Sequence, residues 1–141
     1  MYINQIKPMV KANLDEVILW RRHFHEFPEL SFEEFETSKF IAEKLNKMGF
    51  EVKNNVGGTG VIATFYSGIG GPNIAFRADM DALPILEDTG LEFESKIPGV
   101  MHACGHDCHM AILLGTAFMI SQMKDSFKGT IKFIFQPGEE T

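Results

Sequence analysis

The stretch that decides the fold is "DCHMAILLGTAFMISQMKDSFKGTIKFIF", residues Asp107 to Phe135. Its first part, Asp107 to Met123, is apolar nearly all round, which is typical of a buried helix rather than a surface helix. Gly129 ends that region, and "TIKFIF", Thr130 to Phe135, follows as a strand rich in β-branched and aromatic residues. A buried helix that leads into an apolar strand is typical of an α/β domain.

Working outward from this stretch, the upstream sequence predicts two more helices and three more strands. A helical repeat of apolar residues predicts a first helix from about Asn4 to about His25, before Pro28. Ser31 and Glu34 form a capping box for a second helix that ends at Gly49. Strands are predicted over Phe50–Asn55, Gly60–Gly68 and Asn73–Asp79, and a loop over Pro84–Pro98. The alternation predicts an α/β domain in which helices flank a mostly parallel mixed sheet.

Composition excludes several classes of protein. The 141 residues, 45% of them apolar and 23% charged, suit one globular domain with a real core. A net charge of −6 and scattered Lys and Arg residues argue against a nucleic-acid partner. No apolar run is long enough for a membrane span, and no signal peptide is recognisable, so we expect a cytoplasmic protein. Cys104 and Cys108 are too close in sequence to suggest a secreted disulfide framework, and their spacing is not that of a CxxC redox motif.

The chemistry is concentrated in "MHACGHDCHM", Met101 to Met110, which holds three of the five histidines and both cysteines. Cys104 and His106 are separated by one glycine, which lets a thiolate and an imidazole address the same metal ion. For either residue alone a structural role is the better reading, but the density of the cluster before a buried helix favours metal binding. Cys108 is interpreted as a packing residue, while His102 and His109 are candidates for supporting the metal ligands through hydrogen bonds.

Two carboxylate pairs accompany this cluster. Glu139 and Glu140 follow a Pro-Gly turn, and in extended backbone their side chains would point opposite ways, one to a metal and one to a substrate as a general base. An exposed acidic pair is the alternative. Asp79 and Asp81 follow a strand and could orient ligands or bind metal, or simply cap the loop before Pro84. Because ligands collect beyond the carboxyl ends of strands in open α/β sheets, we expect these clusters to converge.

Two other features have structural interpretations. His23 and His25 lie near the predicted end of the first helix, where positive charge is favoured, so a structural role is preferred. The glycines of "NNVGGTGVI" precede a strand and not a helix, so they indicate a turn rather than a phosphate-binding loop.

Taken together and in order, five motifs closely resemble the amino-terminal part of the M20 metallopeptidase family. They are "RRHFHEFPELSFEE", "GGTGVIA", "FRADMDALPI", "PGVMHACGHDCHMA" and "IKFIFQPGEE". The match is to the amidohydrolase branch, which includes N-acyl-amino-acid amidohydrolases, hippurate hydrolases and auxin-conjugate hydrolases. The resemblance implies that Cys104, His106 and Glu140 are metal ligands, that Glu139 is the base, and that Asp81 orients a ligand with Asp79 close by.

The resemblance also implies an activity and a domain organisation. The activity is hydrolysis of the amide bond in an N-acyl amino acid or related small conjugate, with two divalent ions of manganese, zinc, cobalt or nickel. Residues 1–141 would be the amino-terminal part of a zinc-peptidase-like catalytic domain, incomplete without further histidine ligands, the remaining strands and the lid or dimerisation domain. A non-catalytic metal-binding or assembly module stays open as an alternative. An incomplete sheet would expose an edge, so a homo-oligomer is expected to be possible.

Overall fold

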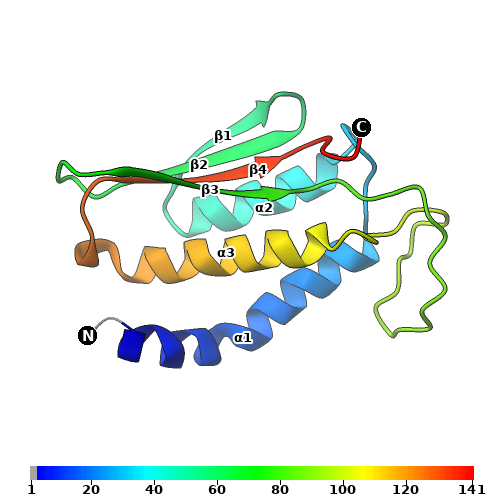
Figure 1. Ribbon diagram of the computed structural model, residues 1–141, viewed down its shortest axis with the longest axis horizontal. Coiled ribbons are helices and arrows are strands. Elements are labelled where there is room, and N and C mark those ends of the chain that lie inside the picture. Colours follow the sequence, from blue (N-terminus) through cyan, green and yellow to red (C-terminus); the bar gives the residue numbers. More distant parts are fainter. Residues whose placement is uncertain (1–2) are drawn as a thin grey trace.

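The computed structural model describes residues 3–141 (Figure 1). Every predicted helix and strand is present, with bounds that differ from the predicted ones by a few residues. The elements are α1 (Ile3–Glu26), α2 (Phe35–Lys47), β1 (Glu51–Val56), β2 (Gly60–Tyr66), β3 (Asn73–Asp79), α3 (His106–Gln122) and β4 (Thr130–Gln136), with a short 3-10 turn over Lys124–Ser126.

The strands form one mixed sheet in the order β1-β2-β4-β3. Only β3 and β4 are parallel, in register from Asn73 beside Thr130 to Asp79 beside Gln136. The pairs β1–β2 and β2–β4 are antiparallel. The mixed α/β architecture with flanking helices is therefore confirmed, but the prediction of a mostly parallel sheet was wrong. The turn between β1 and β2 is too short for the crossover that a parallel pair needs, whereas α3 provides that crossover between β3 and β4.

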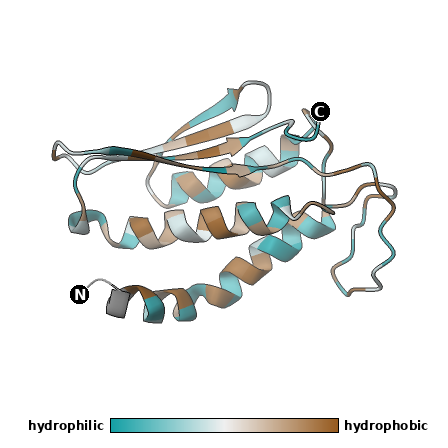
Figure 2. Cartoon of the chain, in the orientation of Figure 1, coloured by the Kyte–Doolittle hydropathy of each residue, from teal (hydrophilic) through white to brown (hydrophobic). Residues whose placement is uncertain are grey.

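The helices lie on one side of the sheet in two layers (Figure 1). α2 and α3 pack against the strands, and α1 packs on α3 from outside. This position between sheet and helix explains why α3 is rich in apolar residues, several of which are the brown segments along the helix in Figure 2. Met110 and Leu114 are fully buried, and Gly115 lets α1 approach so closely that a Cβ atom there would lie 2.8 Å from Val17.

Aromatic side chains fill the core between the sheet and the helices. Phe133 at the centre of β4 is fully buried, and its ring meets that of Phe50 edge to face with 5.3 Å between centroids. Phe24 of α1 and Phe135 of β4 are each 1% exposed. Both belong to one core cluster, which therefore includes residues from the first helix and from the last strand.

The start of α2 differs from the prediction. Glu34 is the N-cap residue and makes no side-chain capping bond, so the capping box with Ser31 was wrong. The Glu29 carboxylate instead accepts the backbone N–H groups of Glu36, at 3.1 Å, and Thr37, at 2.8 Å. The helix keeps a carboxylate at its amino end, while Ser31 and Glu34 are left for contacts with other segments.

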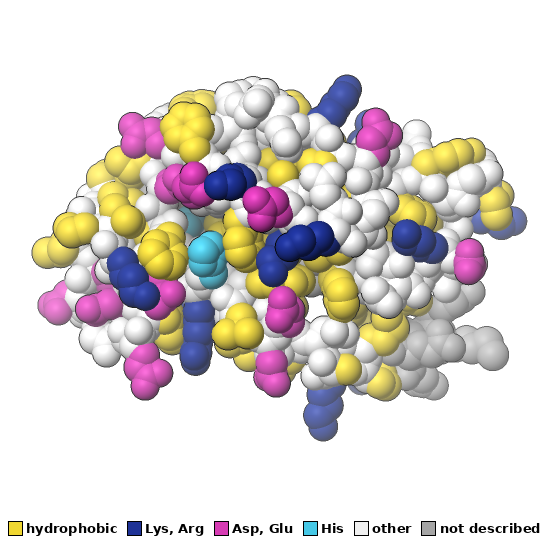
Figure 3. Space-filling model, turned by 180° about the vertical axis from the view of Figure 1, so that it is seen from behind, with side chains coloured by type: hydrophobic (Ala, Val, Ile, Leu, Met, Phe, Trp, Pro, Cys, Tyr) yellow, Lys and Arg dark blue, Asp and Glu magenta, His cyan; other side chains and the backbone are white. Residues whose placement is uncertain are grey.

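The predicted loop over Pro84–Pro98 is present and runs beside the end of α1. The Lys96 ammonium binds the Glu26 carboxylate at 2.8 Å, and the Lys96 N–H donates to the Glu26 carbonyl at 2.8 Å. On the face of the molecule in Figure 3, Lys and Arg side chains are interspersed with Asp and Glu side chains. No helix within residues 3–141 combines the length and the hydrophobicity that a membrane crossing requires.

Candidate metal centre

The predicted clusters meet beyond the carboxyl ends of β3 and β4, next to the start of α3. Since these strands are parallel neighbours, Asp79 and Gln136 end them side by side. The Met80 N–H donates to the Gln136 carbonyl at 2.9 Å, which keeps the chains together past the strand ends. The segments after the two strands are thus delivered to one place, as the strand-end rule predicts.

Cys104, His106 and Glu140 bring one potential ligand atom each to a common point. The thiol sulfur, an imidazole nitrogen and a carboxylate oxygen all lie within 4.8 Å of one another. The His106 Nε2 atom is 3.9 Å from a carboxylate oxygen of Glu139 and 3.9 Å from one of Glu140. The three residues for which the resemblance implied metal binding are therefore close together, although Glu140 is far from the other two in sequence.

Gly105 makes the turn that presents Cys104 and His106. Its φ of 89° lies in the left-handed region, and it is the N-cap residue of α3. A residue with a Cβ atom would be strained in this conformation, whatever the surrounding space. The single glycine between the thiol and the imidazole thus has the role that the sequence spacing suggested.

Asp81 organises the site without standing among the three ligand candidates. Its carboxylate accepts the Ser31 hydroxyl at 2.7 Å and the Glu140 N–H at 2.9 Å. Its backbone carbonyl lies 2.9 Å from His106 Nδ1. Because a carbonyl only accepts, Nδ1 must carry the proton, which leaves the Nε2 lone pair for the cluster. Asp81 therefore contacts His106 through its backbone carbonyl and the turn that carries Glu140 through its carboxylate.

The protonation of Asp81 fits this role. Burial alone would raise the pKa of its carboxyl group. The hydrogen bonds from the Glu140 N–H and the Ser31 hydroxyl outweigh that effect and hold the pKa below its ordinary value. Asp81 thus stays an acceptor for both donors.

Glu34 is a second buried anchor, and the sequence analysis assigned it a different role. Its side chain is fully buried and accepts the Gly138 N–H at 3.0 Å, as well as the Thr59 hydroxyl. It therefore holds the Pro-Gly turn that precedes Glu139 and Glu140. The only sequence signal was an acidic residue three positions after Ser31, and local capping was the simpler reading of that spacing.

The electrostatics of the cluster suit a cation. The pKa of the Cys104 thiol is raised, mainly by a hydrogen bond with the Glu140 carboxylate. Burial and the negative charges of Glu140 and Glu139 add to this effect. Glu140 also has a buried carboxylate oxygen with no hydrogen-bond partner among residues 3–141. A divalent ion would meet both conditions, because it would favour the thiolate and satisfy that oxygen. A thiolate, an imidazole and a carboxylate together fit a transition metal such as zinc.

The remaining predicted residues have different surroundings. Glu139 is 42% exposed beside His106, which is compatible with access to a substrate. Glu139 and Glu140 lie in a turn, not in extended backbone, and both carboxylates face His106.

Asp79 is paired with Arg77 at 2.6 Å and so has different partners from Asp81. His109 is exposed with its ring 5.8 Å from that of His106. His102 is buried, and neither ring nitrogen has a hydrogen-bond partner within the described residues.

Comparison with known proteins finds the family that the sequence motifs resemble. Residues 75–141 match the pattern of Peptidase family M20/M25/M40. The chain is 50% identical over 139 residues to Thermostable carboxypeptidase 1 of Saccharolobus solfataricus. That alignment covers 98% of this chain and 35% of the carboxypeptidase. It is 49% identical over 136 residues to the N-acyl-L-amino acid amidohydrolase of Geobacillus stearothermophilus. That alignment covers 96% of this chain and 37% of the amidohydrolase.

A solved structure extends the similarity to three dimensions. The Bacillus subtilis YXEP protein, described as a dinuclear metal binding peptidase from the M20 family, aligns with a TM-score of 0.87 and 50% identity. The alignment covers 92% of this chain and 36% of that one. The chain spans about a third of the length of the curated relatives it matches. The predicted resemblance to the M20 family and the mixed α/β fold are confirmed.

Proposed function

Because this chain is a relative of the M20 metallopeptidases, in their amidohydrolase branch, we propose that residues 1–141 form the amino-terminal part of a metallohydrolase catalytic domain. The observation that carries the proposal is the convergence of Cys104, His106 and Glu140, whose ligand atoms lie within 4.8 Å of one another. The rest of that domain and a lid or dimerisation domain would lie outside these residues, in line with the length of the relatives.

The proposed reaction is hydrolysis of the amide bond of an N-acyl amino acid or a related small conjugate. It would release a carboxylic acid and an amino acid. The support for this substrate class is the N-acyl-L-amino acid amidohydrolase among the relatives, at 49% identity.

Cys104, His106 and Glu140 would hold divalent metal, two ions in the complete enzyme. Ions bound there would lower the pKa of a water molecule and polarise the scissile carbonyl. Glu139 is close to His106 but half open to solvent, so its carboxylate can take a proton from that water and return it to the leaving nitrogen. Asp81 would keep His106 in the tautomer that leaves Nε2 free. The donor set accommodates manganese, zinc, cobalt or nickel.

A second candidate function is a metal-binding or assembly module without turnover. The observation in its favour is that three ligands suffice for one ion but not for a pair. Ligands for a second ion would then have to come from sequence outside residues 1–141. We therefore expect the 141-residue chain alone to hydrolyse little or nothing.

The first test is metal content per chain, measured by elemental mass spectrometry on protein purified without chelator. We expect bound transition metal in the wild-type chain and in Cys108→Ala, the matched control, and its loss in Cys104→Ala. Equal metal in Cys104→Ala would contradict the proposed ligand set.

The second test is hydrolysis of N-acetyl and N-benzoyl amino acids, followed by release of the free amino acid with and without chelator. Metal binding without turnover would support the module for this chain. Robust chelator-sensitive turnover would show that 141 residues suffice, against our expectation. The Glu139→Gln variant would then have to abolish turnover while retaining metal, or Glu139 is not the base.

A further inference from the structure

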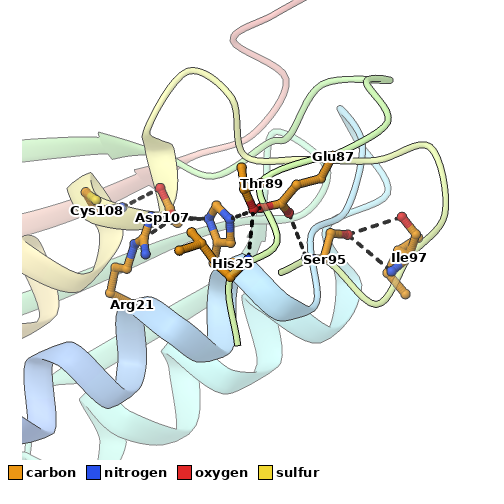
Figure 4. A network of polar contacts seen from close by, with 9 residues as sticks. Arg21, His25, Glu87, Thr89, Ser95, Ile97, Asp107 and Cys108 are labelled. Atoms are coloured by element: carbon orange, nitrogen blue, oxygen red, sulfur yellow. Dashed lines mark hydrogen bonds and ion pairs between the residues drawn. The ribbon is translucent and has the colours of Figure 1, made fainter. Parts of the chain in front are cut away.

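His25, near the end of α1, bridges two carboxylates from other parts of the chain (Figure 4). Its Nδ1 atom is 2.6 Å from an oxygen of Asp107, at the start of α3. Its Nε2 atom is 3.0 Å from an oxygen of Glu87, in the loop over residues 84–98. The His25 side chain is 3% exposed, and the Glu87 and Asp107 side chains are 3% and 1% exposed. One buried imidazole therefore joins three segments of the fold.

The chemistry of this bridge is directional. A carboxylate accepts hydrogen bonds and does not donate them, so a hydrogen bond to Asp107 needs a proton on Nδ1 of His25 and one to Glu87 needs a proton on Nε2. Arg21, one turn earlier on α1, adds an ion pair to the same Asp107 oxygen at 2.9 Å. The buried negative charge of Asp107 is thus balanced from α1 alone, which ties the two helices together at this point.

Asp107 connects this bridge to the candidate metal centre. It directly follows His106 in sequence, and its other oxygen accepts the Cys108 N–H at 2.8 Å. One oxygen of Asp107 is therefore bound to the first turn of α3 and the other to His25 on α1. Any displacement of Asp107 must also move the left-handed turn at Gly105 and the two ligand candidates on either side of it. Metal ligands depend strongly on such supporting contacts for their orientation.

We propose that His25 is a positioning residue for the metal centre: through Asp107 it holds the turn that carries Cys104 and His106. Through Glu87 it holds the neighbouring loop at the same point. As far as it concerns metal, this inference rests on the proposed function. It replaces the general helix-end role expected from the sequence. His23, by contrast, packs its ring on Phe40, with 4.3 Å between centroids.

Two conservative substitutions separate the two halves of the bridge. The side-chain nitrogen of Asn lies about where Nδ1 lies, so His25→Asn can still donate to Asp107. The side-chain nitrogen of Gln lies about where Nε2 lies, so His25→Gln can still donate to Glu87. A role in packing alone predicts similar behaviour for both variants, whereas positioning through Asp107 predicts rescue by Asn and not by Gln.

The first readout is Co²⁺ affinity of the 141-residue chain, followed through the thiolate-to-cobalt absorption band. We expect His25→Asn to bind Co²⁺ within a few-fold of wild type, and His25→Gln to bind about 10–100-fold more weakly, as is typical when a supporting contact of a metal ligand is lost. Glu87→Gln alters only the other half of the bridge, where it removes the carboxylate charge, and should keep the wild-type Co²⁺ affinity. Equal affinity of the Asn and Gln variants, or strong loss in Glu87→Gln, would overturn the inference.

A metal-free readout makes the test independent of the proposed function. Hydrogen exchange of the backbone amides over residues 104–109 should be faster in His25→Gln than in His25→Asn, at matched global stability measured by urea unfolding. Equal exchange in the two variants would refute positioning. If wild type fails to bind Co²⁺ but the exchange difference is present, the proposed metal site fails and the positioning role stands.

Discussion

Lowering the pH should destabilise this protein most strongly through His102. Its side chain is buried, and neither ring nitrogen has a hydrogen-bond partner within the described residues. Burial disfavours the charged imidazolium, and the net effect of the charged groups around it leaves the pKa of His102 at about 4, from 6.5. Below pH 6.5 the unfolded chain therefore binds a proton that the folded chain does not, so the contribution to stability falls as pH falls from 6.5 to about 4.

The size of this effect follows from the shift. Each unit of pKa difference between the folded and unfolded states is worth ~1.4 kcal/mol. A fall from 6.5 to about 4 corresponds to about 3 kcal/mol in the free energy of unfolding, lost over that interval. This is a large part of the free energy of unfolding of a whole domain, which is typically about 5–15 kcal/mol.

The assay is urea unfolding of the metal-free chain at several pH values between about 7 and 4. Carboxyl groups also titrate near the lower end, so the informative quantity is the difference in pH dependence between wild type and His102→Gln. His109→Gln, which removes an exposed imidazole from the same segment, is the matched control. We expect His102→Gln to lose most of the pH dependence above pH 5. If it retains the wild-type dependence, the account of His102 is wrong.

Three further predictions concern the same structure. Gly105→Ala forces a left-handed φ on a residue with a Cβ atom, so unfolding by urea should be easier by ~1–2 kcal/mol and Co²⁺ affinity should fall; an unchanged midpoint would contradict the requirement for glycine. For Glu87, burial works against ionisation, but hydrogen bonds from Thr89, Ser95 and His25 lower the pKa to about 2 from 4.5. The contribution of Glu87 to stability is therefore complete above pH 4.5 and lost toward pH 2. Glu87→Gln should make the urea unfolding midpoint depend less on pH over that window, and the same pH dependence as wild type would exclude this role. Phe133→Ala should cost about 3–5 kcal/mol by urea unfolding because Phe133 is fully buried, and a loss below ~1 kcal/mol would show that the core does not depend on its ring.

Much of the fold was predictable because its signals are local. The apolar run of α3, the Pro after α1 and the Gly residues that separate the strands act within a few residues of each element. Strand pairing is different, because it depends on which strands become neighbours. The order β1-β2-β4-β3 places β4 between β2 and β3, and this gave the sheet more antiparallel pairing than the alternation of elements suggested.

The candidate site divides in the same way. Cys104 and His106 could be paired from the sequence because one glycine lies between them. The contacts of Ser31, Glu34 and His25 could not be predicted from the sequence, because each of these residues reaches a partner at least 50 positions away. Glu34 also has a nearer partner in Thr59. Their local surroundings, at or near helix ends, suggested capping and helix-end roles.

By itself, the sequence determined the elements and the chemical character of the site: a thiol, an imidazole and carboxylates in short motifs beside predicted strand ends. Only the tertiary structure decided which of these groups meet. Glu140 reaches Cys104 and His106 because β3 and β4 run parallel side by side, with α3 crossing between them. Asp81 and Glu34 accept partly buried hydrogen bonds from the turn that carries Glu140. A local pattern cannot encode these meetings, because they depend on how the hydrophobic surfaces of distant elements pack together.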